Sequence, residues 1–512
     1  MNPFAQTVIA GLISGILILD SVQVAQLLFS RPFFAGAIIG LAAGCPIEGA
    51  VFGLFFDLLY SSEIPAGGAI PPNGLAGAAA AVTAYSAAGF TEPLSFFYGL
   101  LFAWIFPHIE RKLREIRSSW NIAFAEELSD SRARFGFWFM RSYLLEFLTM
   151  FSVVLAAGMT AAVISWSCTF PFFIEDGAAC AYSVMPVIGI WTLYFRFRKY
   201  IMSGMKDRAS AAGAPMGAQS SLEAAMPAAA ADEKKLLSRV FRRLFLIQSC
   251  WNYERYQNFG FLYAVMPFLD VIYSIPEQKK EAALRNFGTV NTHPVMAPLL
   301  AGAVAKMEYG IASGTEKAER SIKIKQTLSA AAASFGDRIF WAKLKPVSLQ
   351  LGLFVWIVCG FSGWLFNFHI ISYRPSRLLL IAGPLFSVIV YSAAACIMRW
   401  KCLAAGFFGN EKNLYGLSSL PLEKVGRALD ISGFIFSAAL IVEVFCCFFI
   451  KVRLFGDDMS TIFAKITVIM LSALLGRFVA ANAAGAQASA AAVFLIAVFF
   501  SMTGAPVVSI CL

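Results

Sequence analysis

Long apolar runs recur along the whole chain, and they constrain its fold more than any other feature. Each run is long enough to cross the hydrocarbon core of a bilayer, which takes roughly 20 residues. With 59% hydrophobic and only 14% charged residues, the chain lacks the polar surface that a soluble domain needs. The pattern predicts an all-α polytopic membrane protein with about eight to eleven spans or part-spans. The runs lie at about 4–29, 33–60, 76–107, 144–168, 178–202, 347–371, 377–399, 431–452, 461–481 and 485–511.

The ends and the charges of these runs predict how the chain sits in the membrane. The first run is expected to be retained, because residues 1–6 are not basic and no clear cleavage site precedes Asp20. The net charge of +10 is concentrated at 111–117, 196–199 and 234–243. By the positive-inside rule these segments are predicted to be cytoplasmic. The basic charge therefore requires no nucleic-acid partner, and lipid is the expected surrounding.

A segment of different composition divides the chain. Residues 206–232 are of low complexity and rich in Ala, Gly, Ser and Pro, so they cannot form a packed core. A flexible linker of this length has an r.m.s. span of roughly 30 Å, which allows two membrane domains to lie side by side. We therefore predict membrane domains at 1–205 and 233–512, joined by a cytoplasmic tether.

Polar and helix-breaking residues interrupt the apolar runs of the first domain. Asp57 and Glu63 precede segment 64–74, which is rich in Pro and Gly and cannot continue a straight helix. Because irregular backbone at membrane depth must line a protein cavity, this pattern predicts a discontinuous helix or a re-entrant loop. Asp20 and Gln23 would share a helix face. They either contact a ligand, or Asp20 caps the next helix and Gln23 bonds to a neighbouring one.

The second domain opens with a segment that combines polar and aromatic residues. The apolar positions of 240–255 recur at helical spacing, which predicts an interfacial or re-entrant amphipathic helix. Within it, Glu254 and Arg255 are expected to neutralise charges inside the protein. Amides suit pairs of sugar hydroxyls and an aromatic face suits the apolar side of a sugar ring, although such residues also form interface belts and helix caps. The ligand-like residues of this kind are Trp251, Asn252, Gln257 and Asn258.

These segments resemble a known family. The first domain, with Asp20, Arg31 and Pro32 and the stretches 53–57 and 64–72, resembles the IIC component of a mannose-family permease of the bacterial phosphoenolpyruvate-dependent sugar phosphotransferase system. The second domain resembles the IID component of the same system over about 235–345. Its matching motifs lie at 249–261, 291–294 and 336–341.

The resemblance implies a fused IIC–IID permease in the bacterial cytoplasmic (inner) membrane. Such a permease imports a hexose or amino sugar that a separate cytoplasmic IIA–IIB pair phosphorylates, assembles as a homotrimer, and needs no cofactor or metal. The chain departs from the family pattern at Asp57, where Glu is usual, at Asn73, where Asp is usual, and at Arg338, where Pro is usual. Taken together, the candidate substrate-binding residues are Asp20, Gln23, Asp57, Asn73, Trp251, Asn252, Glu254, Gln257, Asn258, Asn291, Thr292, His293 and Asp337.

Other functions are less well supported by the sequence. No phosphate-binding Gly-Lys-Ser/Thr loop, no Gly-x-Ser-x-Gly elbow and no His-Glu-x-x-His motif occurs, which disfavours an ATPase, a serine hydrolase and a zinc protease. A membrane enzyme could use His293 and Asp337, but the loops around them carry no recognisable nucleophile. A carrier for a sugar or other small polar solute, working without phosphorylation, stays open because interrupted helices in two halves also fit carriers.

Overall fold

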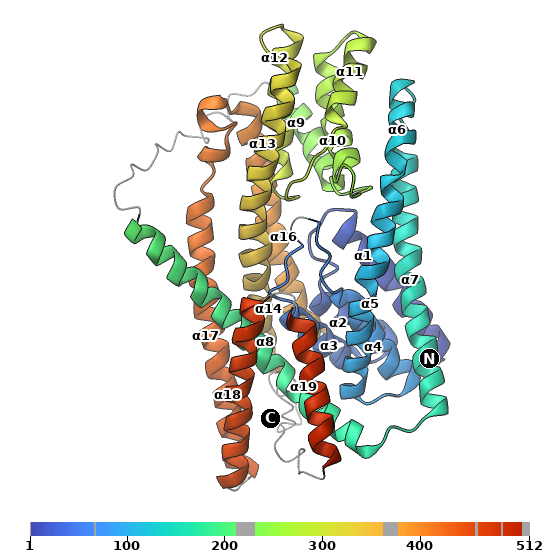
Figure 1. The fold of residues 1–512 in the computed structure, drawn as a ribbon, viewed down its shortest axis with the longest axis vertical. Coiled ribbons are helices and arrows are strands. Elements are labelled where there is room, and N and C mark those ends of the chain that lie inside the picture. The colour runs from blue at the N-terminus through green and yellow to red at the C-terminus, as the bar shows by residue number, and fades with distance from the viewer. Residues whose placement is uncertain are drawn as a thin grey trace.

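The computed structural model describes residues 2–65, 68–210, 231–361, 377–455, 459–482 and 485–503. Within these ranges the chain is helical and contains no strand, only two isolated bridges near Tyr256. Eight helices are long and apolar enough to cross a membrane. The prediction of an all-α polytopic membrane protein is therefore confirmed, and Figure 1 shows the helices as an elongated bundle.

The first half contributes eight helices. Proline occupies the first turn of α1, α2 and α3, where its missing N–H leaves no bond unmade. The helices are α1 (Pro3–Val22), α2 (Pro32–Ala43), α3 (Pro46–Leu59), α4 (Gly74–Ala88), α5 (Glu92–Ser118), α6 (Trp120–Ser129), α7 (Phe135–Ser167) and α8 (Phe172–Ser210).

The prediction of one span over 33–60 is wrong, because α2 and α3 form a tight helical hairpin. Gly44 ends α2 with a φ of 88°, which glycine adopts without strain. The helices cross where their backbones touch. A Cβ on Gly36 would lie 2.2 Å from the carbonyl oxygen of Gly49, and one on Gly53 would lie 2.0 Å from that of Pro32. Paired small residues allow this approach in membranes, and hydropathy alone does not show the break.

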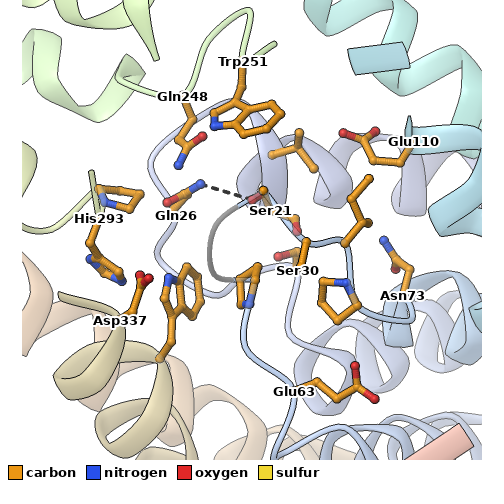
Figure 2. Close-up of a pocket in the computed structure, with 18 of the residues that line it drawn as sticks. Ser21, Gln26, Ser30, Glu63, Asn73, Glu110, Gln248, Trp251, His293 and Asp337 are labelled. Atoms are coloured by element: carbon orange, nitrogen blue, oxygen red, sulfur yellow. Dashed lines mark hydrogen bonds between the residues drawn. The ribbon is translucent and has the colours of Figure 1, made fainter. Parts of the chain in front are cut away.

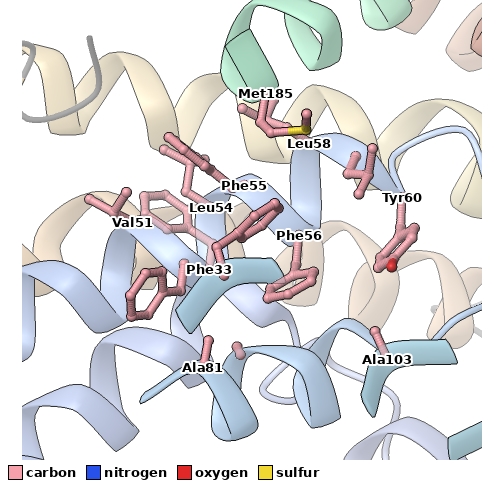
Figure 3. Close-up of a cluster of buried hydrophobic side chains, with 14 of the residues drawn as sticks. Phe33, Val51, Leu54, Phe55, Phe56, Leu58, Tyr60, Ala81, Ala103 and Met185 are labelled. Atoms are coloured by element: carbon pink, nitrogen blue, oxygen red, sulfur yellow. The ribbon is translucent and has the colours of Figure 1, made fainter. Parts of the chain in front are cut away.

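Aromatic side chains pack around this hairpin into the main core. Figure 3 shows Phe33 of α2 and Phe55 and Phe56 of α3 among residues of α4, α5 and α8. The rings of Phe56 and Tyr60 stack with centroids 6.1 Å apart. Beyond Leu59, the described residues 60–65 and 68–73 are not helical, and helix resumes at Gly74, which is the interruption that the sequence predicts. The core therefore fixes both ends of a non-helical segment.

The second half begins at α9, so helical structure extends into both ends of the predicted linker. Residues 211–230 of that linker lie outside the described residues. The helices and short turns of this half are α9 (Ala231–Arg243), η2 (Leu244–Leu246), α10 (Asn258–Ile272), α11 (Pro276–Asn286), α12 (Ala297–Ala312), α13 (Ala318–Gly336), η3 (Asp337–Leu344), α14 (Lys345–Trp356), η4 (Ile357–Phe361), α16 (Arg377–Phe408), η5 (Glu411–Asn413), η6 (Leu417–Ser419), α17 (Leu422–Phe455), α18 (Met459–Ala481) and α19 (Gly485–Met502).

The helix predicted over 240–255 ends early, at Leu246. Asn252 explains part of this difference, because its side chain bonds local backbone groups that a helix would use. Its Nδ2 donates to the carbonyl of Cys250 at 3.1 Å, and its Oδ1 accepts from the N–H of Arg255 at 2.9 Å. Asparagine competes with helix formation in this way. The motif is therefore a loop between η2 and α10.

One long helical rod of the second half changes its winding part-way. The segments α13, η3 and α14 run continuously, and η3 is wound as a π-helix. Such bulges are frequent at functional sites because they redirect side chains. The predicted apolar run begins only at 347, whereas the apolar helix extends over Ala318–Gly360. The rod places Asp337 beside the loops of both halves.

Candidate substrate cavity

A cavity of about 730 Å³ lies between the two halves. The first half contributes the end of α1, the loop after it, α3, the 60–73 segment and α5, and the second half contributes the 248–257 and 289–294 loops and the α13–α14 rod. Figure 2 shows His293 and Asp337 on one side of the cavity and Asn73 and Glu110 on the other. Nine of the candidate residues line it: Asp20, Asp57, Asn73, Trp251, Gln257, Asn291, Thr292, His293 and Asp337.

Two first-half residues of the lining also hold the backbone in place. The carboxylate of Asp20 accepts hydrogen bonds from the N–H groups of Leu27 at 2.9 Å and Ser30 at 3.2 Å. The carboxamide of Asn73 accepts from the N–H of Ala76 at 3.0 Å and so caps α4. Both side chains therefore shape the cavity wall, whatever contact they make with a ligand.

Asp57 is paired with a buried arginine. Nε of Arg31 donates to Oδ2 of Asp57 at 2.6 Å. The other guanidinium nitrogens of Arg31 donate to Oγ of Ser348 at 2.8 Å and to the carbonyl oxygen of Lys345 at 2.6 Å. Both partners lie on α14, so this ion pair joins the two halves beside the cavity.

Side-chain hydrogen bonds hold the 248–257 and 289–294 loops of the second half together. Gln257 donates to the carbonyl oxygen of Thr292 at 2.6 Å and accepts from the Thr292 N–H at 3.2 Å. His293 is buried against Gly336, where a Cβ would lie 2.1 Å from the histidine Cβ. Only glycine fits there, which gives a packing reason for the Gly that precedes Asp337 in the motif.

His293 lies in the cavity wall as a neutral ring with a defined proton position. Burial lowers the pKa of His293 well below its usual range, and the nearby positive Arg399 adds to this effect, so the ring is neutral. Nδ1 accepts a hydrogen bond from the N–H of Val295 at 3.1 Å, which places the ring proton on Nε2. Nε2 is buried in the cavity wall and has no partner among the described residues.

The lining contains several other buried polar atoms without a protein partner in the described part of the chain. They are Oε1 of Gln26, Oε1 of Glu63, Oε2 of Glu110 and Oγ1 of Thr292. Leaving a buried polar group unsatisfied costs about 1–3 kcal/mol. These atoms give the wall of the cavity a reserve of unsatisfied polar groups.

A charged cluster on α5 also borders the cavity and was not among the predicted site residues. Glu110 and Arg114 line the cavity, and the Arg114 guanidinium carbon lies 4.3 Å from the ring centroid of Trp251. Arg117, predicted to lie in a cytoplasmic basic segment, is instead buried and pairs with Glu110 and Glu146. These residues look like ordinary topological charges in the sequence. Only the packing of α5 against α7 and the 248–257 loop shows otherwise.

Three candidate residues lie outside the cavity, in a network that joins the halves. Nδ2 of Asn121, on α6, donates to Oδ1 of Asn252 at 3.0 Å and to Oε2 of Glu254 at 2.9 Å. Oδ1 of Asn121 accepts from Nδ2 of Asn258 at 2.8 Å. Glu254 also pairs with Arg255 at 3.2 Å, as the sequence suggests. The amides are thus hydrogen-bonded to protein groups in this structure.

Gln23 also lies outside the lining. Its Oε1 accepts from Oγ of Ser142 on α7 at 2.9 Å and from the N–H of Cys250 at 3.1 Å. Of the two readings of Gln23, the hydrogen bond to a neighbouring helix matches the structure. Gln23 is the C-cap residue of α1, and its N–H still bonds to the carbonyl oxygen of Leu19.

Glu63 is a cavity carboxyl whose charge changes near neutral pH. Burial raises the pKa of Glu63 from 4.5 to about 7, and the positive Lys345 opposes this only in part. The folded state thus favours the protonated carboxyl. Its contribution to stability is complete below about pH 4.5 and is lost as the pH rises through about 7.

Replacing Glu63 by glutamine should therefore remove a pH-dependent loss of stability. Between about pH 5 and pH 8 we expect the wild type to lose on the order of 1–3 kcal/mol relative to Glu63→Gln, since one pKa unit is about 1.4 kcal/mol. Thermal unfolding of both detergent-solubilised proteins across this range measures the difference. A constant difference between the two proteins would contradict the assignment.

Comparison with known proteins identifies the family of each half. Residues 232–373 match the family model of the PTS system mannose/fructose/sorbose family IID component, and residues 4–197 match that of the PTS system sorbose-specific IIC component. The chain belongs to the mannose family of phosphotransferase-system permeases. It is a fused IIC–IID permease and a multi-pass protein of the bacterial cytoplasmic membrane. As a sugar-specific transporter subunit, the permease works with separate IIA and IIB proteins that carry out phosphoryl transfer.

Individual relatives of the permease match its second half. The mannose-specific EIID component of Escherichia coli K12 is 28% identical over 215 residues, which cover 41% of the permease and 69% of the relative. The fructose permease IID component of Bacillus subtilis is 26% identical, covering 41% and 69%. The solved complex of mannose transporter ManYZ with microcin E492 is similar at 27% identity over 41% of the permease and 69% of that chain, with a TM-score of 0.30.

Proposed function

We propose that the cavity between the halves binds one hexose or amino sugar, which the permease then carries across the membrane. The unpaired polar atoms of Gln26, Glu63, Glu110, Thr292 and His293 around a single cavity support this proposal most directly. The volume of about 730 Å³ lies within the roughly 300–1,000 Å³ typical of small-molecule sites. Trp251 and Trp341 supply apolar faces for a sugar ring.

The names of the relatives support a hexose as substrate. The similar IID components are named for mannose, fructose and, in Klebsiella pneumoniae, sorbose, and all three sugars are hexoses. A carrier that works without phosphorylation is disfavoured because both halves match components of the phosphotransferase system.

We further propose that the predicted domains, 1–205 and 233–512, act as one transport unit and that three copies form a homotrimer. Direct bonds across the cavity support the single unit, as in the contact of Arg31 with Ser348. The trimer rests on the family resemblance. Native mass spectrometry of the detergent-solubilised permease tests the homotrimer. A permease that is monomeric and still transports sugar would refute it.

Basic residues outside the cavity provide a docking surface for the IIB protein. Arg111 and Lys112 on α5 and Arg239 and Arg242 on α9 are exposed. Complementary charge speeds association and orients partners. The same residues also satisfy the positive-inside rule. Phosphoryl transfer from purified IIB, measured with the basic residues replaced, therefore has to separate IIB docking from membrane topology.

Uptake of radiolabelled hexoses into proteoliposomes tests the whole proposal. With phosphorylated IIB from the same organism we expect the accumulated sugar to be sugar phosphate, because phosphoryl transfer resides on the partner proteins. Without IIB we expect only unmodified sugar. Sugar phosphate formed without the partner would refute the transporter assignment, and ion-driven accumulation of free sugar would favour the phosphorylation-independent carrier.

A further inference from the structure

The last two described helices belong to the second half in sequence but pack against the first half in space. Figure 1 shows α18 and α19 beside the lower part of α8, and contacts of both helices with α8 agree with this view. Residues 459–502 lie beyond both matched regions, which end at 197 and 373. These helices therefore need a structural and functional explanation of their own.

The packing of this hairpin on α8 is specific, because the backbones approach closely at two points. A Cβ on Gly476 of α18 would lie 2.6 Å from Cβ of Trp191 and 3.0 Å from the carbonyl oxygen of Ile188. A Cβ on Gly177 of α8 would lie 2.6 Å from Cα of Val498 on α19. Such contacts leave no room for lipid between the helices. The hairpin is an integral part of the first half.

One polar residue of the hairpin reaches the cavity wall. Nε2 of Gln487, on α19, donates to the carbonyl oxygen of Leu100 on α5 at 2.8 Å. The hydroxyl of Tyr60 donates to Oε1 of the same amide. Because a carbonyl oxygen can only accept, the Leu100 contact fixes the amide orientation and leaves its oxygen toward Tyr60. Tyr60 lines the cavity between α3 and Glu63.

We propose that α18 and α19 complete the IIC domain from the far end of the chain, and that Gln487 is a positioning residue for Tyr60 in the cavity wall. The role in sugar binding rests on the proposed function of the cavity. Without Gln487 the tyrosine hydroxyl would be buried with no partner from α19, and the ring could leave its stacked position on Phe56.

A double-mutant cycle on the full chain tests the positioning role. Isothermal titration with the transported hexose should show affinity about five- to tenfold weaker for Tyr60→Phe and for Gln487→Leu, since both variants lose the buried hydrogen bond between Tyr60 and Gln487. In the Tyr60→Phe background, Gln487→Leu should weaken binding no further. If Gln487 only stabilised the fold, Gln487→Leu would lower stability, and its effect on sugar affinity would not depend on Tyr60. Wild-type affinity of Gln487→Leu, or fully multiplicative losses, would overturn the inference.

A matched control and a sugar-independent measurement complete the test. Asn482→Leu removes an exposed amide from the loop between α18 and α19 and should bind sugar as the wild type does. If Gln487→Leu does not fold, cysteines at Phe97 and Phe494, whose ring centroids lie 4.5 Å apart, still report the placement of α19. Cross-linking of the two thiols by a short bis-maleimide is expected, because a reagent with a spacer does not need disulfide geometry, and its absence would refute the hairpin placement.

The outcomes separate this inference from the proposed function. If the permease binds no hexose while the cross-link forms, the cavity assignment fails and the hairpin placement stands. If Asp337→Ala weakens binding and Gln487→Leu does not, only the positioning role fails.

Discussion

Replacing Arg31 by methionine is expected to destabilise the folded permease by about 3–5 kcal/mol, because the change leaves Asp57 buried without its partner. The Arg31 side chain is fully buried, and its three bonded partners lie on α3 and α14. The loss would therefore loosen the contact between the halves as well. Thermal unfolding followed by size-exclusion chromatography measures the effect.

Two further variants show whether the unpaired charge causes this loss. The double variant Arg31→Met/Asp57→Leu should recover part of the stability, because it removes the orphaned carboxylate. Arg134→Met removes an exposed partner of Glu127 and should cost less than about 1 kcal/mol. If Arg31→Met costs no more than Arg134→Met, the buried pair does not join the halves.

Replacing Asp337 by alanine should weaken sugar binding about ten- to hundredfold. Asp337 begins the π-wound segment and faces the cavity beside His293 (Figure 2). Hydrogen bonds to charged groups are worth about 1.5–3 kcal/mol, which corresponds to this range of affinities. Titration of the purified variant with the transported hexose provides the measurement.

The control for this variant is an aspartate of the second half far from the cavity. Asp270 on α10 pairs with Lys279 at the surface, so Asp270→Ala should bind sugar as the wild type does. Equal affinities of Asp337→Ala and the wild type, with both proteins folded, would remove Asp337 from the proposed site.

A feature of the fold or site could be predicted from the sequence when neighbouring residues alone determine it. The interrupted segment after Leu59 was predictable because Pro and Gly prevent a continuous helix whatever surrounds them. Asp337 and His293 stand out because their motifs occur together in one family. The split between α2 and α3 was not predictable from hydropathy, since two short apolar helices and one long one have the same composition. The prediction of a helix over 240–255 was wrong because apolar spacing does not show that the Asn252 side chain bonds the local backbone.

Sequence by itself determined the membrane location, the helical class and the family of this permease, because hydropathy and local motifs are properties of neighbouring residues. The tertiary structure alone decided which polar groups face the cavity. Asn252 and Gln257 are similar amides five residues apart, yet the first is satisfied by Asn121 and the second lines the cavity. The tertiary structure also places α19, from near the end of the chain, beside Tyr60. Such pairings join residues more than a hundred positions apart, and the physical reason is that each polar group in a membrane protein must find its partner wherever the packing places one.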